Sequence, residues 1–117
     1  MEFVALLSSG KGTWGQISGL IKKGEWEKII LLGPDYAKDF KLDGFEFDFI
    51  EYNSEKNITS LKEDFLKKLK GKFEGTEVAL SIASGSGKEH MALVSALLSI
   101  PVGVRFTALT QEGIIMM

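Results

Sequence analysis

Two segments of this chain share one pattern, in which an apolar run leads directly into a serine- and glycine-rich loop that carries a lysine. The first segment is Val4–Gly12, VALLSSGKG, and the second is Val78–Lys88, VALSIASGSGK. Continuous apolar runs of this length are typical of strands that are buried on both faces of a parallel sheet. Serine and glycine leave backbone N–H groups unobstructed, so such a loop suits an anion. If the two runs are neighbouring parallel strands, their loops form one composite site, for which phosphate is the expected ligand.

Strand-like and helix-like segments alternate along all 117 residues. The strand-like segments are residues 3–7, 28–32, 45–49, 77–83 and 102–109, and the clearest helix-like segments surround residues 17–21, 60–73 and 89–99. This alternation predicts one Rossmann-like α/β domain over residues 1–117. Its open, mostly parallel sheet is expected to have about five strands, with helices on both faces.

The order of the strands follows from their polarity and connections. In the third strand-like segment Phe45, Phe47 and Phe49 alternate with Glu46 and Asp48, which indicates a position at or near a sheet edge. Together with right-handed crossovers, this favours the order 3-2-1-4-5. The first and fourth strands are then adjacent at the topological switch point, where ligands of such sheets bind.

Two further segments give local predictions. Ser60-Leu61-Lys62-Glu63 matches a capping box and predicts the start of a helix there. The apolar tail, residues 113–117, is expected to be either a short extra strand or an interface element.

Composition excludes several classes of function. A net charge of −2 and a pI near 5.4 argue against non-specific nucleic-acid binding. The chain has no cysteine and one histidine, so neither a disulfide framework nor a metal site is expected. It shows no leader pattern and no apolar stretch long enough for a membrane, which predicts a cytoplasmic protein without a membrane partner. Because 13 of its 14 basic residues are lysine, the composition also leans toward a thermophilic source.

The first loop has a spacing found in dinucleotide-binding proteins. Gly10–Gly15, GKGTWG, fits G-x-G-x-x-G, and Asp35 follows twenty residues later. Against this reading, Lys11 and Trp14 are bulky for a tight turn, and Asp35 follows a Gly-Pro turn instead of ending a strand. A nucleotide-cofactor site and a plain glycine-rich turn both stay open, and no cofactor is predicted.

The second loop is not a P-loop. Its first glycine would fall at Ile82, and the hydroxyl that binds magnesium would fall at Glu89. The second loop still places the ammonium group of Lys88 and several backbone donors at a helix N-terminus. The helix dipole there favours an anion.

Two side chains near these loops have alternative roles. His90, the only histidine, is expected to be a structural or surface residue, with a catalytic role beside the loop as the alternative. Trp14 is expected either to pack in the core or to stack on a base, since base stacking on an aromatic ring contributes about 1–3 kcal/mol.

The second loop and the helix after it resemble the CRISPR-associated Rossmann-fold (CARF) sensor domains, which carry a Ser/Thr-Gly-Gly-Thr-Lys-type loop after the fourth strand. Here Ser84, Gly85 and Lys88 match that loop. Ser8, Ser9 and Gly10 match the serine- and glycine-containing loop after the first strand. The resemblance spans most of the chain in topology and is specific in about ten residues.

The resemblance implies a stand-alone homodimer that binds cyclic oligoadenylate or another phosphate-rich ligand, with dimer contacts through the apolar helix Met91 to Leu98. The implied ligand-binding residues are Ser8, Gly10, Gly12, Thr13, Trp14, Ser84, Gly85, Ser86, Gly87 and His90. Some stand-alone members cleave the ring without metal by attack of a ribose 2′-hydroxyl on the adjacent phosphate. Lys88 and Lys11 would then stabilise the developing charge and Ser9 would position the ring. The residues do not decide between binding and cleavage, and a non-catalytic interaction subunit is the alternative from another class.

Overall fold

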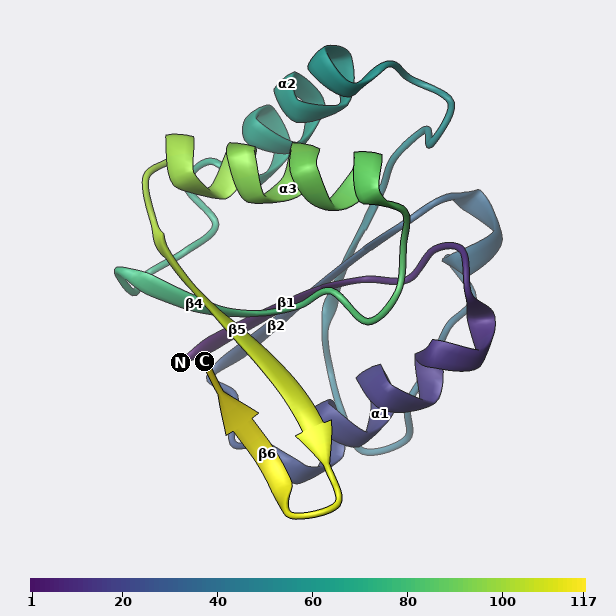
Figure 1. Cartoon of the computed structure of the whole chain (residues 1–117), viewed down its shortest axis with the longest axis vertical. Helices are drawn as coiled ribbons and strands as arrows, with labels where there is room; N and C mark the ends of the chain where they lie inside the picture. Colours follow the sequence, from purple (N-terminus) through teal and green to yellow (C-terminus); the bar gives the residue numbers. More distant parts are fainter.

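The computed structural model of the chain has one six-stranded sheet and three α-helices (Figure 1). It describes the backbone of residues 1–117 and every side chain except that of Lys11. The strands are β1 (Glu2–Leu6), β2 (Lys28–Gly33), β3 (Asp48–Glu51), β4 (Glu77–Ser81), β5 (Gly103–Thr110) and β6 (Gly113–Met116). The helices are α1 (Trp14–Lys23), α2 (Ile58–Leu69) and α3 (Gly87–Ser99), with short 3-10 helices η1 (Lys11–Thr13) and η2 (Asp35–Ala37).

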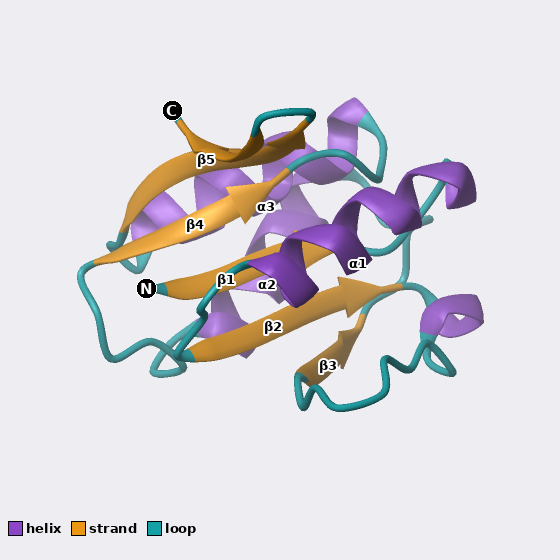
Figure 2. Ribbon diagram, turned by 90° about the horizontal axis from the view of Figure 1, so that it is seen from below, coloured by secondary structure: helices purple, strands orange, loops and turns teal.

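The strand order is β3-β2-β1-β4-β5-β6, which confirms the predicted fold class and the order of the first five strands. All neighbouring strands run parallel except β5 and β6, which form an antiparallel hairpin. The tail is therefore a sixth strand. β1 lies at the centre, where Val4 is in register with Ile30 of β2 and with Leu80 of β4 (Figure 2).

The sheet lies between two helical layers, with α1 on one face and α2 and α3 on the other (Figure 1). Successive side chains of a strand point to opposite faces, and both faces of β1 are covered. Val4 and Leu6 pack in the core with α2 and α3, whereas Phe3, Ala5 and Leu7 pack in the core with α1. This two-sided burial explains why the strand reads as a continuous apolar run.

None of the helices that the structure describes combines the length and the apolar character needed to cross a membrane.

The third strand begins later than its alternating pattern predicted. Pairing with β2 starts at Asp48, opposite Ile30, so Phe45 and Phe47 precede the strand. The ring of Phe47 instead packs against Phe40, with ring centroids 5.7 Å apart. The segment around Phe47, which its sequence pattern assigns to a strand, is therefore held outside the strand by contacts between aromatic rings.

The second α-helix begins earlier than the expected capping box. Its N-cap is Asn57, whose side chain accepts a hydrogen bond from the Ser60 backbone N–H at 2.9 Å, and its first residue is Ile58. The predicted start at Ser60 is therefore wrong, because an asparagine is at least as good an N-cap as a serine and comes first along the chain.

Replacing Gly33 with alanine is expected to lower the free energy of unfolding by about 1–3 kcal/mol. A Cβ atom at Gly33 would lie 2.6 Å from the Leu7 carbonyl oxygen and 2.8 Å from the Ala37 Cβ atom, and neither belongs to a flexible side chain. Gly15→Ala is the matched control, because Gly15 lies in α1 with no atom within 4 Å of the new group, and it should be neutral or stabilising. Urea denaturation of both variants measures the difference, and equal stability would contradict this packing.

Candidate functional site

The loops that follow β1 and β4 are hydrogen-bonded to each other at the carboxyl edge of the sheet. The Ser8 backbone N–H donates to Ser84 Oγ at 2.9 Å, and this hydroxyl in turn donates to the Ser9 carbonyl oxygen at 3.2 Å. The Gly85 N–H donates to the same carbonyl at 3.1 Å. The structure therefore brings the two serine- and glycine-rich loops together at the switch point between β1 and β4.

A left-handed glycine shapes each loop. Gly10 has φ +80° and Gly85 has φ +107°, conformations that other residues rarely adopt. Gly85 is also crowded, because an added Cβ would lie 3.0 Å from Leu6 Cδ1 and 3.1 Å from His90 Nε2. Substitution at either glycine is therefore expected to change the path of the loop.

A buried carboxylate, that of Glu89 in the first turn of α3, lies behind both loops. Glu89 Oε2 accepts a hydrogen bond from Ser8 Oγ at 2.7 Å and a second, short one from the Tyr52 hydroxyl. Its other oxygen, Oε1, accepts from the Ser86 backbone N–H at 2.8 Å, and the Ser86 hydroxyl caps α3 in return. One carboxylate thus joins the segments that follow β1, β3 and β4.

Hydrogen bonds keep this carboxylate ionised although only 3% of Glu89 is exposed. Burial acts to raise the pKa of Glu89, but the donors from Tyr52, Ser8 and Ser86 favour the charged form and lower the pKa below its ordinary value. Burial, followed by donation to Glu89, raises the pKa of the Tyr52 hydroxyl far above its ordinary value. The phenol therefore stays protonated and remains a donor.

The ammonium group of Lys88 faces the loop between β3 and α2. Lys88 Nζ donates to the carbonyl oxygens of Ser54 and Lys56 at 2.7 and 2.8 Å. An ammonium group carries three N–H donors, so these two bonds leave one for a ligand. The side chain of Lys11, the other predicted charge-stabilising group, lies outside the described residues.

The remaining site residues from the sequence have local structural roles. His90 Nε2 lies 2.6 Å from the Ser84 carbonyl oxygen, so this ring braces the second loop. Trp14 Nε1 donates to the Ser8 carbonyl at 3.1 Å, and its ring packs edge-on against Phe40. The Thr13 hydroxyl donates to the Gly10 carbonyl at 2.5 Å and closes the turn of the first loop.

The structure gives little support to a dinucleotide site at the glycines of the first loop. In that motif the third glycine permits close packing of the helix on the sheet. Here an added Cβ at Gly15 would meet no atom within 4 Å. Asp35, the acidic residue of the pattern, forms an ion pair with Lys38 at 2.9 Å.

Two cavities have walls formed in part by segments that follow strands of the sheet. One, of about 670 Å³, lies between the segments that follow β2 and β3 and is lined by Tyr36, Tyr52, Ser54 and Lys56 among others. A second, of about 530 Å³, lies between the start of α1 and the strands β4 and β5, and Thr13 is the one predicted ligand residue on its described wall. Among the predicted site residues with described side chains, none lines the first cavity and only Thr13 lines the second.

One face of α3 carries exposed apolar side chains. Met91 is 65% exposed and Leu98 is 56% exposed, and with Ile82, Val94 and Phe106 they line a shallow hollow of about 450 Å³. The predicted apolar helix therefore has one apolar face in the core and one facing outward.

Sequence reasoning missed Tyr52 and Glu89, the two residues at the centre of the polar network. A signal for Glu89 was present, since Ser86-Gly87-Lys88-Glu89 has the spacing of a capping box and the structure forms both of its hydrogen bonds. Tyr52 carries no such local signal, because its partner lies 37 residues along the chain. Among the described residues, no three histidine, aspartate or glutamate side chains gather as a metal site.

Comparison with protein-family models and with curated protein sequences gives no match for this chain.

Glu89→Gln is expected to lower the free energy of unfolding at pH 7 by about 2–3 kcal/mol, because hydrogen bonds to a charged acceptor are lost and an amide N–H₂ faces a donor. A group whose folded pKa is lowered stabilises the protein above its unfolded pKa, and this stabilisation is lost as the pH falls through the folded value. The unmodified protein should therefore lose stability below about pH 4.5, and the variant should lose less over that range. Urea denaturation from pH 3 to 7 measures both effects.

Glu112→Gln, at an exposed position in the β5–β6 turn, is the matched control and should keep the stability and pH dependence of the unmodified protein. If Glu89→Gln behaves as this control does, the carboxylate does not hold the three segments together.

Proposed function

We propose that this chain is a homodimeric nucleotide-binding domain of the CARF type, which binds a phosphate-rich ligand such as cyclic oligoadenylate at the paired loops. The observation that carries the proposal is the direct hydrogen bonding of the β1 and β4 loops through Ser8, Ser9, Ser84 and Gly85. Ligands of open α/β sheets bind at such a switch point. A loop-to-helix turn there offers backbone N–H groups to an anion.

Lys88 is the cationic contact in this proposal. Its ammonium group is fixed at the edge of the sheet by the carbonyl oxygens of Ser54 and Lys56 and keeps one donor for a phosphate oxygen.

The exposed apolar face of α3 supports the homodimer. Ile82, Met91 and Leu98 are each more than two-fifths exposed. Ile82 and Met91 lie on either side of the second loop along the chain, and Leu98 lies near the other end of α3. Pairing of two such faces would bury these side chains and place the two copies of the loops next to each other.

Cleavage of the ring is the enzymatic form of this proposal. The ribose 2′-oxygen would form a bond to the adjacent phosphorus while the bond from phosphorus to the 5′-oxygen breaks, and the proton of the 2′-hydroxyl would pass to the leaving oxygen. Lys88 would stabilise the charge on the phosphate and Ser9 would position the ring. Linear products formed in the presence of a metal chelator distinguish cleavage from binding alone.

Lys88→Ala is expected to weaken the binding of cyclic tetraadenylate about 10- to 100-fold, because a charge-assisted hydrogen bond to phosphate is lost. Isothermal titration measures the affinity. Lys67→Ala removes an exposed lysine on α2 and is the matched control. Equal affinities for the unmodified protein and Lys88→Ala would contradict the assignment of the site to these loops.

Met91→Glu is expected to convert a dimer into a monomer, because it places a charge in the apolar face that the proposal buries in the interface. Light scattering of the unmodified protein and the variant gives the two masses. Tyr36 is as accessible as these side chains but lies outside this face, so Tyr36→Glu should leave the mass unchanged.

A dimer that binds no ring would favour the second candidate, a non-catalytic interaction subunit that uses the same face. The exposure of Met91 and Leu98 supports both functions. A strictly monomeric unmodified protein would remove the paired site.

A further inference from the structure

Hydrogen bonds of its wall residues connect the cavity between the segments that follow β2 and β3 to the paired loops. Tyr52 lines it, and the Tyr52 hydroxyl donates a hydrogen bond to Glu89, which is hydrogen-bonded to both loops. Ser54 and Lys56 also line it, and their carbonyl oxygens hold Lys88. A ligand with a phosphate at Lys88 therefore has this cavity of about 670 Å³ directly beside it, within the size range of small-molecule sites.

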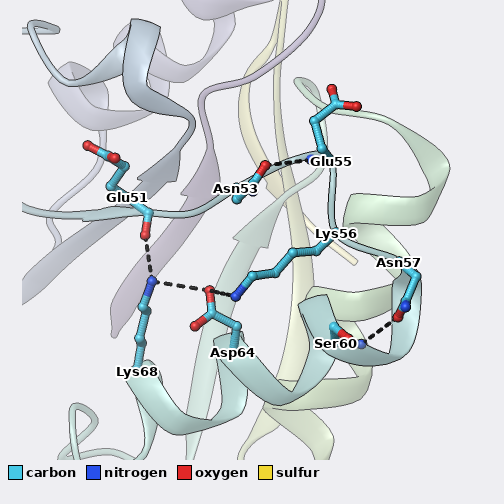
Figure 3. A network of polar contacts seen from close by, with 8 residues as sticks. All are labelled: Glu51, Asn53, Glu55, Lys56, Asn57, Ser60, Asp64 and Lys68. Atoms are coloured by element: carbon cyan, nitrogen blue, oxygen red, sulfur yellow. Dashed lines mark hydrogen bonds and ion pairs between the residues drawn. The ribbon is translucent and has the colours of Figure 1, made fainter.

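The charges on the cavity wall are unfavourable for an anion. Four carboxylates, those of Asp35, Glu51, Glu55 and Asp64, line it against two ammonium groups. Both of these ammonium groups turn toward one carboxylate, since Lys68 Nζ lies 3.1 Å and Lys56 Nζ lies 3.8 Å from Asp64 (Figure 3). Asp35 forms an ion pair with Lys38. The wall therefore offers the carboxylates of Glu51 and Glu55 as hydrogen-bond acceptors to a neutral ligand that carries O–H or N–H donors.

An aromatic ring completes the wall. Tyr36 in η2 lines the cavity and is 52% exposed. Its ring is nearly parallel to that of Trp14, at an interplanar angle of 4° and a centroid separation of 6.5 Å. A ring held in one orientation beside a cavity suits stacking by a planar base.

We infer that this cavity is a nucleoside subsite, in which the base of the ligand stacks on Tyr36 and its amino or ribose hydroxyl groups donate to the wall carboxylates. The inference rests on the proposed function, since the phosphate of the same nucleotide lies at Lys88. The neutral nucleoside enters the acidic cavity while the anionic phosphate stays at the loops. The site therefore favours a ribonucleotide whose base carries an exocyclic amino group.

Isothermal titration with cyclic tetraadenylate, its 2′-deoxy analogue and inorganic tripolyphosphate tests the subsite. Tyr36→Ala should weaken cyclic tetraadenylate about 5- to 150-fold, the range expected for one lost stacking contact. Tyr36→Phe keeps the ring and should bind as the unmodified protein does. Tripolyphosphate, which has no nucleoside, should bind Tyr36→Ala unchanged and Lys88→Ala more weakly.

Two glutamate variants test whether the wall carboxylates accept hydrogen bonds from the ligand. Glu55→Gln on the cavity wall should reduce the preference for cyclic tetraadenylate over its 2′-deoxy analogue or over cyclic tetrauridylate. Glu46→Gln, at an exposed position away from this wall, is the matched control and should leave both preferences unchanged. Urea denaturation of each variant verifies that it is folded.

The outcomes separate the two proposals. If Tyr36→Ala binds the ring as tightly as the unmodified protein while Lys88→Ala binds it weakly, the nucleoside subsite is wrong and the phosphate site stands. If neither variant changes the affinity, or the unmodified protein binds no ring, both proposals fail.

Discussion

The hydrogen bonds to the buried carboxylate of Glu89 hold the carboxyl edge of this sheet together. A buried charge is tolerated only when donors replace the water it has lost. Here the donors come from Ser8, Tyr52 and Ser86, which follow three different strands. Any movement of one of these segments away from the others would leave the charge undersatisfied, so this one side chain opposes the separation of all three.

Lys88 forms a second set of hydrogen bonds at the same edge of the sheet. Its ammonium group donates to two carbonyl oxygens of the segment between β3 and α2 and so connects this segment to the start of α3. Glu89, the next residue, accepts a hydrogen bond from Tyr52 of the same segment. Adjacent residues of α3 thus bind the same segment with opposite charges. This arrangement makes the switch point and the neighbouring cavity one connected structure, on which both the phosphate and the nucleoside proposals depend.

Much of the fold could be predicted from the spacing of apolar residues along the chain. The predictions were wrong where tertiary contacts or a competing N-cap overrode the local pattern. The buried strands β1, β2 and β4 are apolar runs because both faces of each are covered, so their pattern was decisive. The alternation of Phe45 and Phe47 predicted a strand, but ring packing against Phe40 holds that segment outside the sheet. The start of α2 was misplaced because Asn57 and Ser60 both suit an N-cap, and the capping-box pattern favoured Ser60 although Asn57 comes first along the chain.

The sequence by itself determined the class of sheet, the order of its first five strands and the two loops at the switch point, because these follow from local apolar patterns and from the handedness of parallel connections. Only the tertiary structure decided what each polar group contacts. Lys88, which sequence reasoning assigned to an anion, also binds two carbonyl oxygens, and Tyr52 meets Glu89 across 37 positions of the chain. Such contacts depend on which loops lie close together in the folded protein, and a local sequence pattern does not contain that information.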